Sequence, residues 1–125
     1  MLSFNDVNVL GQIIDTTFGR SSTQNGAVSI KMQIVGDSLV FTYHEICNIA
    51  HDRDKFEQVR PMVDRAQKMI KDRVKDVQRE FKRATKRDLK LKETSVGNTL
   101  DPMGYNFLNP VRPTHFKMSA NYQIG

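Results

Sequence analysis

Cysteine and tryptophan are nearly missing from this sequence, whose 125 residues include one cysteine and no tryptophan. A single cysteine cannot form an internal disulfide, which excludes a disulfide-stapled fold and favours a reducing compartment, the cytoplasm. No apolar run approaches the roughly 20 residues of a membrane-spanning helix, so no membrane partner is expected. The N-terminal segment also lacks the basic start and apolar core of a secretory signal. With 38% apolar residues, the chain is expected to fold rather than remain disordered.

Motifs for catalysis and for cofactor binding are absent as well. The seven glycines are scattered and form neither a phosphate-binding loop nor a dinucleotide-binding pattern. Nucleophilic catalysis by Cys47 would need a base, a thiolate-favouring environment and an oxyanion site, and the sequence offers only the bases, His44 or His51. We therefore predict a protein that is not an enzyme and that takes no cofactor and no small-molecule substrate.

The strongest metal-binding candidate in the sequence is the group His44, Cys47 and His51, whose side chains suit zinc. On a helix the three would share one face, but the first and last would lie about 10.5 Å apart along the axis. One ion reaches only adjacent pairs at that spacing, and a fourth ligand such as His115 would come from far along the chain. We therefore expect no metal site here, but a buried cysteine beside partly exposed histidines.

The first part of the chain predicts one helix and one hairpin. Apolar residues recur every three or four positions over 3–19, after a capping-box pair formed by Ser3 and Asp6, which is typical of an amphipathic helix. An extended N-terminal arm is the alternative, because a glycine interrupts the pattern. Apolar and polar residues then alternate over 27–35 and again over 38–42, which indicates an antiparallel hairpin with one buried face.

The middle of the chain predicts two helices. Thr42 and Glu45 have capping-box spacing before a short apolar stretch, which favours a helix over about 43–51. A long amphipathic helix is expected over about 55–88. Three residues are candidates for its start: Asp52, Asp54 and Pro61. Four of its apolar residues are expected to face a sheet: Val63, Ile70, Val77 and Phe81. A brief strand is indicated after it by Leu89, Leu91 and Glu93.

The last part of the sequence changes character. Residues 94–115 hold three of the four prolines together with embedded aromatic residues, which indicates an ordered, irregular arm that needs a surface to lie on. A strict period-two pattern over 115–124 predicts a half-buried strand, which can complete its own sheet or lie along the sheet edge of a neighbour. We accordingly divide the chain into a single α+β domain, residues 1–93 with its N-terminal amphipathic segment, and an arm, residues 94–125.

These elements predict an α+β fold in which a small antiparallel sheet, built from the hairpin and the C-terminal strand, packs on one long helix with an irregular C-terminal arm. Apolar and aromatic groups outside the compact centre favour a non-enzymatic structural subunit of a larger assembly, with copies of itself and other subunits as partners. By analogy of architecture, such a chain suits a virion component of a phage tail, neck or capsid. The expected partner-binding residues are Tyr105, Phe107, Phe116, Met118, Tyr122 and Ile124.

The net charge of +5 supports an alternative function, nucleic-acid binding. The surplus is concentrated in residues 82–92, where six basic residues accompany one acid and are able to contact several phosphates. The run has no interleaved aromatic residues and no base-reading signature, and a helix C-terminus also favours basic side chains. The candidate nucleic-acid contacts are Lys82, Arg83, Lys86, Arg87, Lys90 and Lys92.

Overall fold

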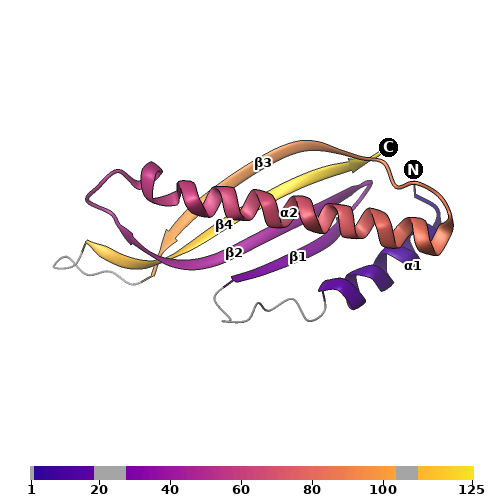
Figure 1. Ribbon diagram of the computed structural model, residues 1–125, viewed down its shortest axis with the longest axis horizontal. Helices are drawn as coiled ribbons and strands as arrows, with labels where there is room; N and C mark the ends of the chain where they lie inside the picture. Colours follow the sequence, from indigo (N-terminus) through magenta and orange to yellow (C-terminus); the bar gives the residue numbers. More distant parts are fainter. Residues whose placement is uncertain (1, 19–27, 104–109) are drawn as a thin grey trace.

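Residues 2–18, 28–103 and 110–125 are described by the computed structural model of the protein. Its elements are α1 (Phe4–Ile13), a π-helical turn (Ile14–Phe18), β1 (Val28–Val35), β2 (Ser38–Ala50), α2 (Lys55–Thr85), β3 (Leu91–Pro102) and β4 (Val111–Ile124). One long helix lies against an antiparallel sheet of four strands, which confirms the predicted α+β fold (Figure 1).

The four strands form one sheet in the order β1-β2-β4-β3. The predicted hairpin of β1 and β2 turns at Gly36, whose φ of +59° lies in the left-handed region that glycine adopts without strain. Strand β4 lies between β2 and β3, and it pairs with β2 from Ser38 opposite Gln123 to Ala50 opposite Val111. The C-terminal strand therefore completes the chain's own sheet, which is one of the two arrangements that the sequence leaves open.

Helix α2 lies diagonally across one face of the sheet (Figure 1). Its N-cap is Asp54, whose carboxylate accepts a hydrogen bond from the Phe56 amide at 3.0 Å and offsets the positive end of the helix. The helix continues through Pro61 and ends at Lys86, which adopts a left-handed conformation. Of the apolar residues expected to face the sheet, three are buried and one is half-buried at the margin of the core: Ile70, Val77 and Phe81, and Val63.

Helix α1 lies beside the C-terminal half of α2 and confirms the predicted N-terminal helix (Figure 1). The predicted capping box is present, with the Ser3 hydroxyl accepting a hydrogen bond from the Asp6 amide at 3.1 Å. The Asp6 carboxylate also forms an ion pair with Arg87, just beyond the end of α2. The Arg87 guanidinium lowers the pKa of this carboxyl below its usual value, so the pairing stabilises the fold above that range and is lost in acid.

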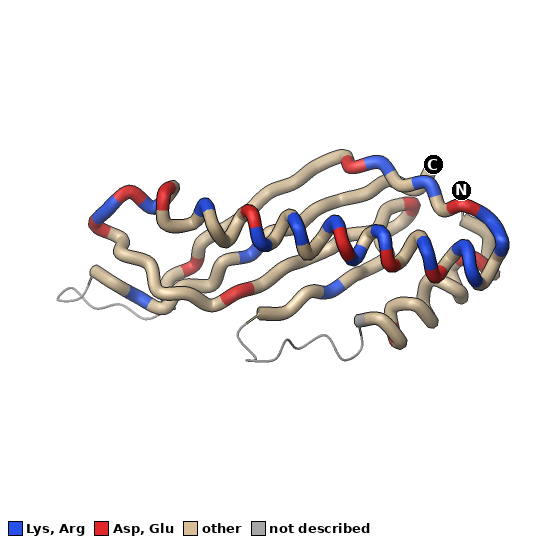
Figure 2. Tube along the Cα trace, in the orientation of Figure 1, with Lys and Arg blue, Asp and Glu red and all other residues tan. Residues whose placement is uncertain are grey.

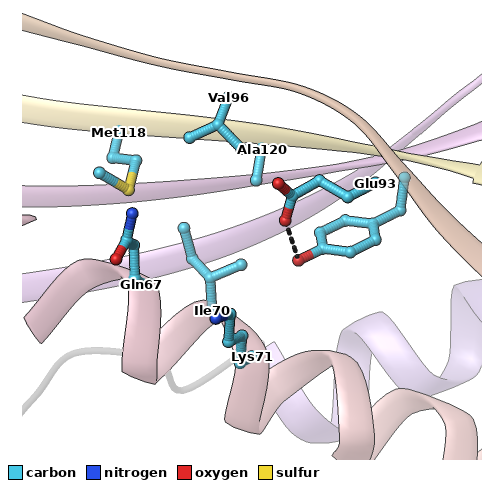
Figure 3. Close-up of a pocket in the computed structure, with 8 residues that line it drawn as sticks. Gln67, Ile70, Lys71, Glu93, Val96, Met118 and Ala120 are labelled. Atoms are coloured by element: carbon cyan, nitrogen blue, oxygen red, sulfur yellow. Dashed lines mark hydrogen bonds between the residues drawn. The ribbon is translucent and has the colours of Figure 1, made fainter. Parts of the chain in front are cut away.

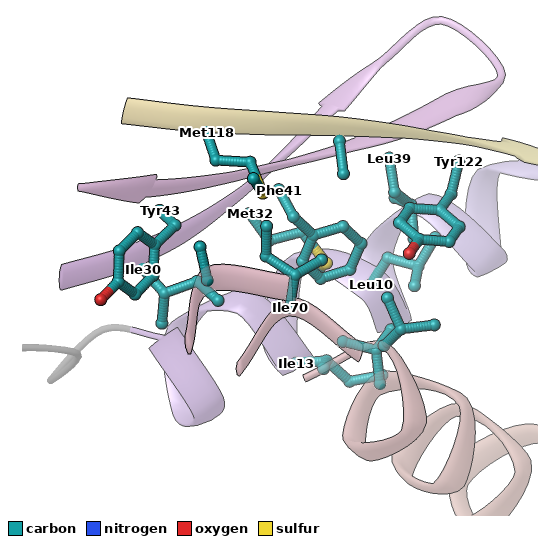
Figure 4. Packing of buried hydrophobic residues seen from close by; sticks show 14 of the residues in the cluster. Leu10, Ile13, Ile30, Met32, Leu39, Phe41, Tyr43, Ile70, Met118 and Tyr122 are labelled. Carbon is teal, nitrogen blue, oxygen red and sulfur yellow. The ribbon is translucent and has the colours of Figure 1, made fainter. Parts of the chain in front are cut away.

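The hydrophobic core lies between the helices and the inner face of the sheet (Figure 4). Two aromatic pairs join β2 to β4 within it: Phe41 meets Tyr122 edge-on with ring centroids 5.6 Å apart, and Tyr43 meets Phe116 at 6.1 Å. Such edge-to-face contacts add to the stabilisation that burial provides. The C-terminal strand is consequently part of the core and not an addition to it.

The helix predicted over 43–51 is wrong, because these residues continue strand β2 up to Ala50. The alternation of buried and less buried residues starts at Leu39 and persists through Tyr43 to Ile49. Every second side chain of β2 therefore lies beneath α2. Pairing with β4 along all of β2 satisfies the backbone, whereas a capping box contributes only about 1 kcal/mol. Tertiary pairing therefore outweighs the local helix signal.

The start of the predicted irregular arm is also a strand. Strand β3 is longer than the brief strand expected near residues 89–93, and it pairs with β4 up to Pro102 opposite Thr114. A bulge between Glu93 and Ser95 is the one register shift in this pairing. Most side chains of β3 are exposed on both faces, so no alternating apolar pattern marks it in the sequence.

Candidate interaction surface

Strand β3 forms one edge of the sheet and is exposed along nearly its whole length. Ten of its twelve residues are exposed, and only Leu91 and Leu100 are partly covered. Helix α2 packs on β2 and β4, and β3 lies beyond it at the border of the sheet (Figure 1). Within residues 2–18, 28–103 and 110–125, no strand pairs with the outer side of β3, and such a long edge strand presents unpaired backbone groups to the surroundings.

The backbone groups of three central residues point toward the free edge of β3. Met103 donates its amide hydrogen to the Pro113 carbonyl at 2.7 Å, so the backbone of Met103 faces β4. Along an antiparallel ladder, residues whose backbone groups face a given neighbour alternate with residues that face away. Met103 and every second residue before it therefore turn their backbone groups toward β4. The residues between them, including Val96, Asn98 and Leu100, turn their amides and carbonyls toward the free edge.

A groove runs beside this edge, between β3 and α2 (Figure 3). Val96 forms part of its β3 wall and is 43% exposed, and Ile70 reaches toward it from the helix. Met118 and Ala120 of β4 contribute further apolar surface. Polar groups also line the groove, among them the side chains of Lys71 and Glu93. The groove therefore offers an apolar recess immediately next to the unpaired backbone of β3. We call the free edge of residues 95–100 together with this groove the β3 edge surface.

One tyrosine of the groove is expected to titrate abnormally. Burial, followed by the hydrogen bond that the Tyr122 hydroxyl donates to Glu93 at 3.1 Å, raises the pKa of Tyr122 from 10 to about 12. The folded state holds this proton more tightly than the unfolded chain. Its contribution to stability is therefore complete below pH 10 and is lost as the pH rises toward 12. Burial also raises the pKa of Tyr43, so two tyrosines should ionise late in an absorbance titration. Tyr122→Phe should remove the step near pH 12.

Glu93→Gln is the matched variant for this titration. It removes the carboxylate charge but leaves Tyr122 buried, so the pKa of Tyr122 should fall only partway toward 10. Ionisation of every tyrosine near pH 10 in the native protein would contradict the structure of the groove.

Two of the residues predicted from sequence to bind a partner, Met118 and Tyr122, line the groove of this surface. Tyr105 and Phe107 lie outside the described residues. The other four are buried in the chain's own core beneath the helices: Phe116, Met118, Tyr122 and Ile124. Phe116 and Ile124 do not line the groove, and the role of all four in partner binding stays a prediction from the sequence.

The opposite face of the sheet is polar and brings together two histidines that are far apart in sequence. His44 and His115 lie with their Nε2 and Nδ1 atoms 2.7 Å apart, and the rings are inclined by only 19°. One nitrogen must carry hydrogen while the other accepts it, so the two rings cannot both be fully protonated in this arrangement. Burial, then the charges of His115, Lys117 and Lys31, lowers the pKa of His44.

The three residues of the metal candidate do not converge. Cys47 and His44 are an odd number of residues apart on β2 and therefore point to opposite faces, while His51 lies beyond the strand with its Nε2 3.1 Å from Thr114 Oγ1. A tetrahedral zinc ion bound by the facing nitrogens of His44 and His115 would hold them about 3.3 Å apart. The two nitrogens lie closer than that, at 2.7 Å, as a hydrogen-bonded pair does. Across the described ranges, no group of three His, Cys, Asp or Glu side chains is placed to hold a metal ion.

Figure 2 shows the basic residues of 82–92 gathered around the C-terminal end of α2 and the turn that follows it. Their side chains are divided between ion pairs and open surface. Lys82 and Arg83 pair with acids at 3.2 Å and 3.0 Å, and Arg87 pairs with Asp6. The other three are exposed and form no ion pair with a described residue: Lys86, Lys90 and Lys92. Half of the basic side chains in this run are thus already engaged by carboxylates, which reduces the number available to phosphates.

Comparison with known proteins does not supply a function. No family model, curated protein or solved structure matches this chain at a significant level. None of the helices in the described part of the chain is long and apolar enough to cross a membrane. Function therefore has to be inferred from the chain's own residues and their arrangement.

Sequence reasoning does not find the β3 edge surface, because it predicts an irregular arm for the same residues. The available signal is weak: Val96 and Leu100 are the two apolar residues in a polar stretch, and they are separated by an even number of positions. Neither the exposure of the strand nor its place at the edge of the sheet is visible in that spacing. Only the insertion of β4 between β2 and β3 makes β3 an edge.

Proposed function

We propose that this protein is a non-enzymatic structural subunit that assembles with copies of itself, and through them into a larger complex, by adding a strand to the free edge of β3. The supporting observation is the β3 edge surface, where Val96, Asn98 and Leu100 turn their backbone groups outward beside an apolar groove. An added strand binds such an edge through main-chain hydrogen bonds, and recesses next to the edge select its side chains.

The distribution of protective features along β3 supports this proposal. Proteins blunt exposed sheet edges with charges, prolines and bulges, because a bare edge pairs with other chains. In β3 these features lie at the two ends: Lys92 and the Glu93/Ser95 bulge at one, and Asp101 and Pro102 at the other. Residues 95–100 contain no charge, no proline and no bulge. The strand thus has an open central window whose ends limit the length of a partner strand.

The apolar character of the groove supports a partner that buries side chains as well as backbone. Val96 is 43% exposed in the single chain and lies beside Met118 and Ala120. Covering this side chain would remove apolar surface from water, which favours association at roughly 25 cal/mol per Å² of surface buried. A place in a virion remains a prediction from the sequence and adds nothing to this physical case.

Substitution of Val96 tests the proposed function. Val96→Lys places a charge at the centre of the window, and we expect it to reduce the native mass to that of a monomer in multi-angle light scattering. Because Val96 is exposed in the single chain, thermal stability should change little. Val35→Lys is the matched control, since Val35 is 52% exposed on the other edge strand and lies outside the β3 edge surface. It should leave the native mass unchanged.

Two results would contradict the proposal. One is a wild-type protein that is monomeric at every concentration tested. The other is an assembly whose mass is the same for wild type, Val96→Lys and Val35→Lys.

Nucleic-acid binding through residues 82–92 is the weaker hypothesis. The three basic residues without ion pairs, Lys86, Lys90 and Lys92, support fewer phosphate contacts than the six that the sequence contains. Each lost contact lowers the salt dependence of binding by about one unit on a log–log scale. No base-reading motif in the described residues compensates for the lost phosphate contacts.

A further inference from the structure

We infer that the strand added to β3 is β3 of a second copy of this chain, running antiparallel, with Asn98 opposite Asn98 of the second copy. The inference rests on the proposed function, because it names the strand that pairs with the same edge. A pairing of a strand with its own copy has two-fold symmetry and closes on itself as a dimer. The two sheets would join into one continuous antiparallel sheet.

Two geometric conditions restrict the register of such a pair. Opposite residues of antiparallel strands point to the same side of the sheet, and hydrogen-bonded residues face each other in pairs. Val96, Asn98 and Leu100 lie on the α2 side, because each is opposite a buried residue of β4. The same three residues turn their backbone groups outward. Both conditions are met only when one residue lies directly opposite the same residue of the second copy, with the two-fold axis between them. Registers in which the axis falls between successive residues are excluded.

Of the registers centred on Gly97, Asn98 and Thr99, only the one centred on Asn98 places the two apolar residues of the window opposite each other. It places Val96 opposite Leu100 of the second copy, and by symmetry Leu100 opposite the second Val96. Centring on Gly97 would place Val96 opposite Asn98, which leaves an apolar side chain against an amide. Centring on Thr99 would place Val96 opposite Pro102, which has no amide hydrogen to donate to the facing carbonyl.

The ends of the strand also agree with centring on Asn98. This register places Pro102 opposite Thr94 of the second copy. Thr94 is the residue that the bulge leaves without an opposite residue in the pairing with β4, since the pairing passes from Glu93 directly to Ser95. The missing amide of Pro102 therefore falls where the ladder is already interrupted. Three central residue pairs, each exchanging two backbone hydrogen bonds, then fill the open window from end to end.

Cysteine cross-linking tests this register directly. Gly97 and Thr99 of the second copy would form a pair without backbone hydrogen bonds, with Cα atoms about 4.5 Å apart, which is within the range of a disulfide. A side chain fits at Gly97, because an added Cβ meets no atom within 4 Å. The full-length Gly97→Cys and Thr99→Cys variants are prepared separately in a Cys47→Ser background, mixed, and oxidised. A Ser95→Cys and Thr99→Cys mixture, which reports the register centred on Gly97, is the matched control.

We expect the Gly97→Cys and Thr99→Cys mixture to give several-fold more reducible covalent dimer than either variant alone or than the control mixture. Preferential linking in the control mixture, or of Gly97→Cys with itself, would overturn the inference. Light scattering of the samples before oxidation distinguishes a failure of the self-pairing register from a failure of the proposed function. An assembly that Val96→Lys dissolves, but that forms no link between positions 97 and 99, overturns the self-pairing register and leaves the proposed function standing. A monomer at every concentration overturns both.

Discussion

Phe116→Ala should lower the free energy of unfolding by about 3–5 kcal/mol, the usual cost of truncating a buried phenylalanine. Phe116 is fully buried at the middle of β4 and meets the ring of Tyr43 edge-on. It lies in the central part of the sheet, opposite Glu45 of β2 on one side and Leu100 of β3 on the other. The surrounding strands cannot collapse into the vacated space without losing their register. Urea denaturation followed by far-ultraviolet circular dichroism measures the loss.

Ser119→Ala is the matched control for this cavity. Ser119 lies on the same strand but is exposed, so its truncation should change the free energy of unfolding by less than about 0.5 kcal/mol. A loss below about 1 kcal/mol for Phe116→Ala would show that the side chain is not buried as the structure has it.

Removing β4 should abolish folding altogether. A chain that ends after Pro102 loses the strand that pairs with β2 on one side and with β3 on the other. It also loses the buried side chains of Phe116, Met118 and Ala120, so β3 has no neighbour left and the helices face an incomplete sheet. We expect the truncated protein to unfold without a cooperative transition in thermal or urea denaturation.

Deletion of Gly125 alone is the control for shortening the chain. Its amide donates a hydrogen bond to the Lys90 carbonyl at 3.0 Å, and loss of one such bond costs only about 1 kcal/mol. Cooperative unfolding of the chain that ends after Pro102, near the midpoint of the intact protein, would mean that β4 is an independent arm.

This second experiment separates the two arrangements that the terminal strand permits. In the structure, β4 serves its own sheet and its inward side chains are buried, so its deletion affects folding before it affects assembly. Association is better probed at β3, where Val96 is altered without disturbing the core. The surface that is free for a partner is thus not the strand with the clearest sequence pattern.

The sequence by itself determines the elements whose patterns reflect burial. The three- and four-residue spacing along α2 predicts a helix because one stripe must face the sheet, and Ile70, Val77 and Phe81 do so. The alternation of β4 predicts a strand for the same reason, since every second residue enters the core. The capping box of Ser3 and Asp6 is read correctly because it depends only on neighbours in the chain.

Only the tertiary structure decides the features that depend on which strands become neighbours. The segment over 43–51 carries a helix signal but becomes strand, because β4 supplies backbone partners that a local motif cannot outweigh. Strand β3 has no burial pattern, because it lies at an edge and exposes both faces. His44 and His115 meet only because their strands are adjacent. A free edge is a property of the order of strands, and strand order is set by long-range pairing that no local spacing of residues encodes.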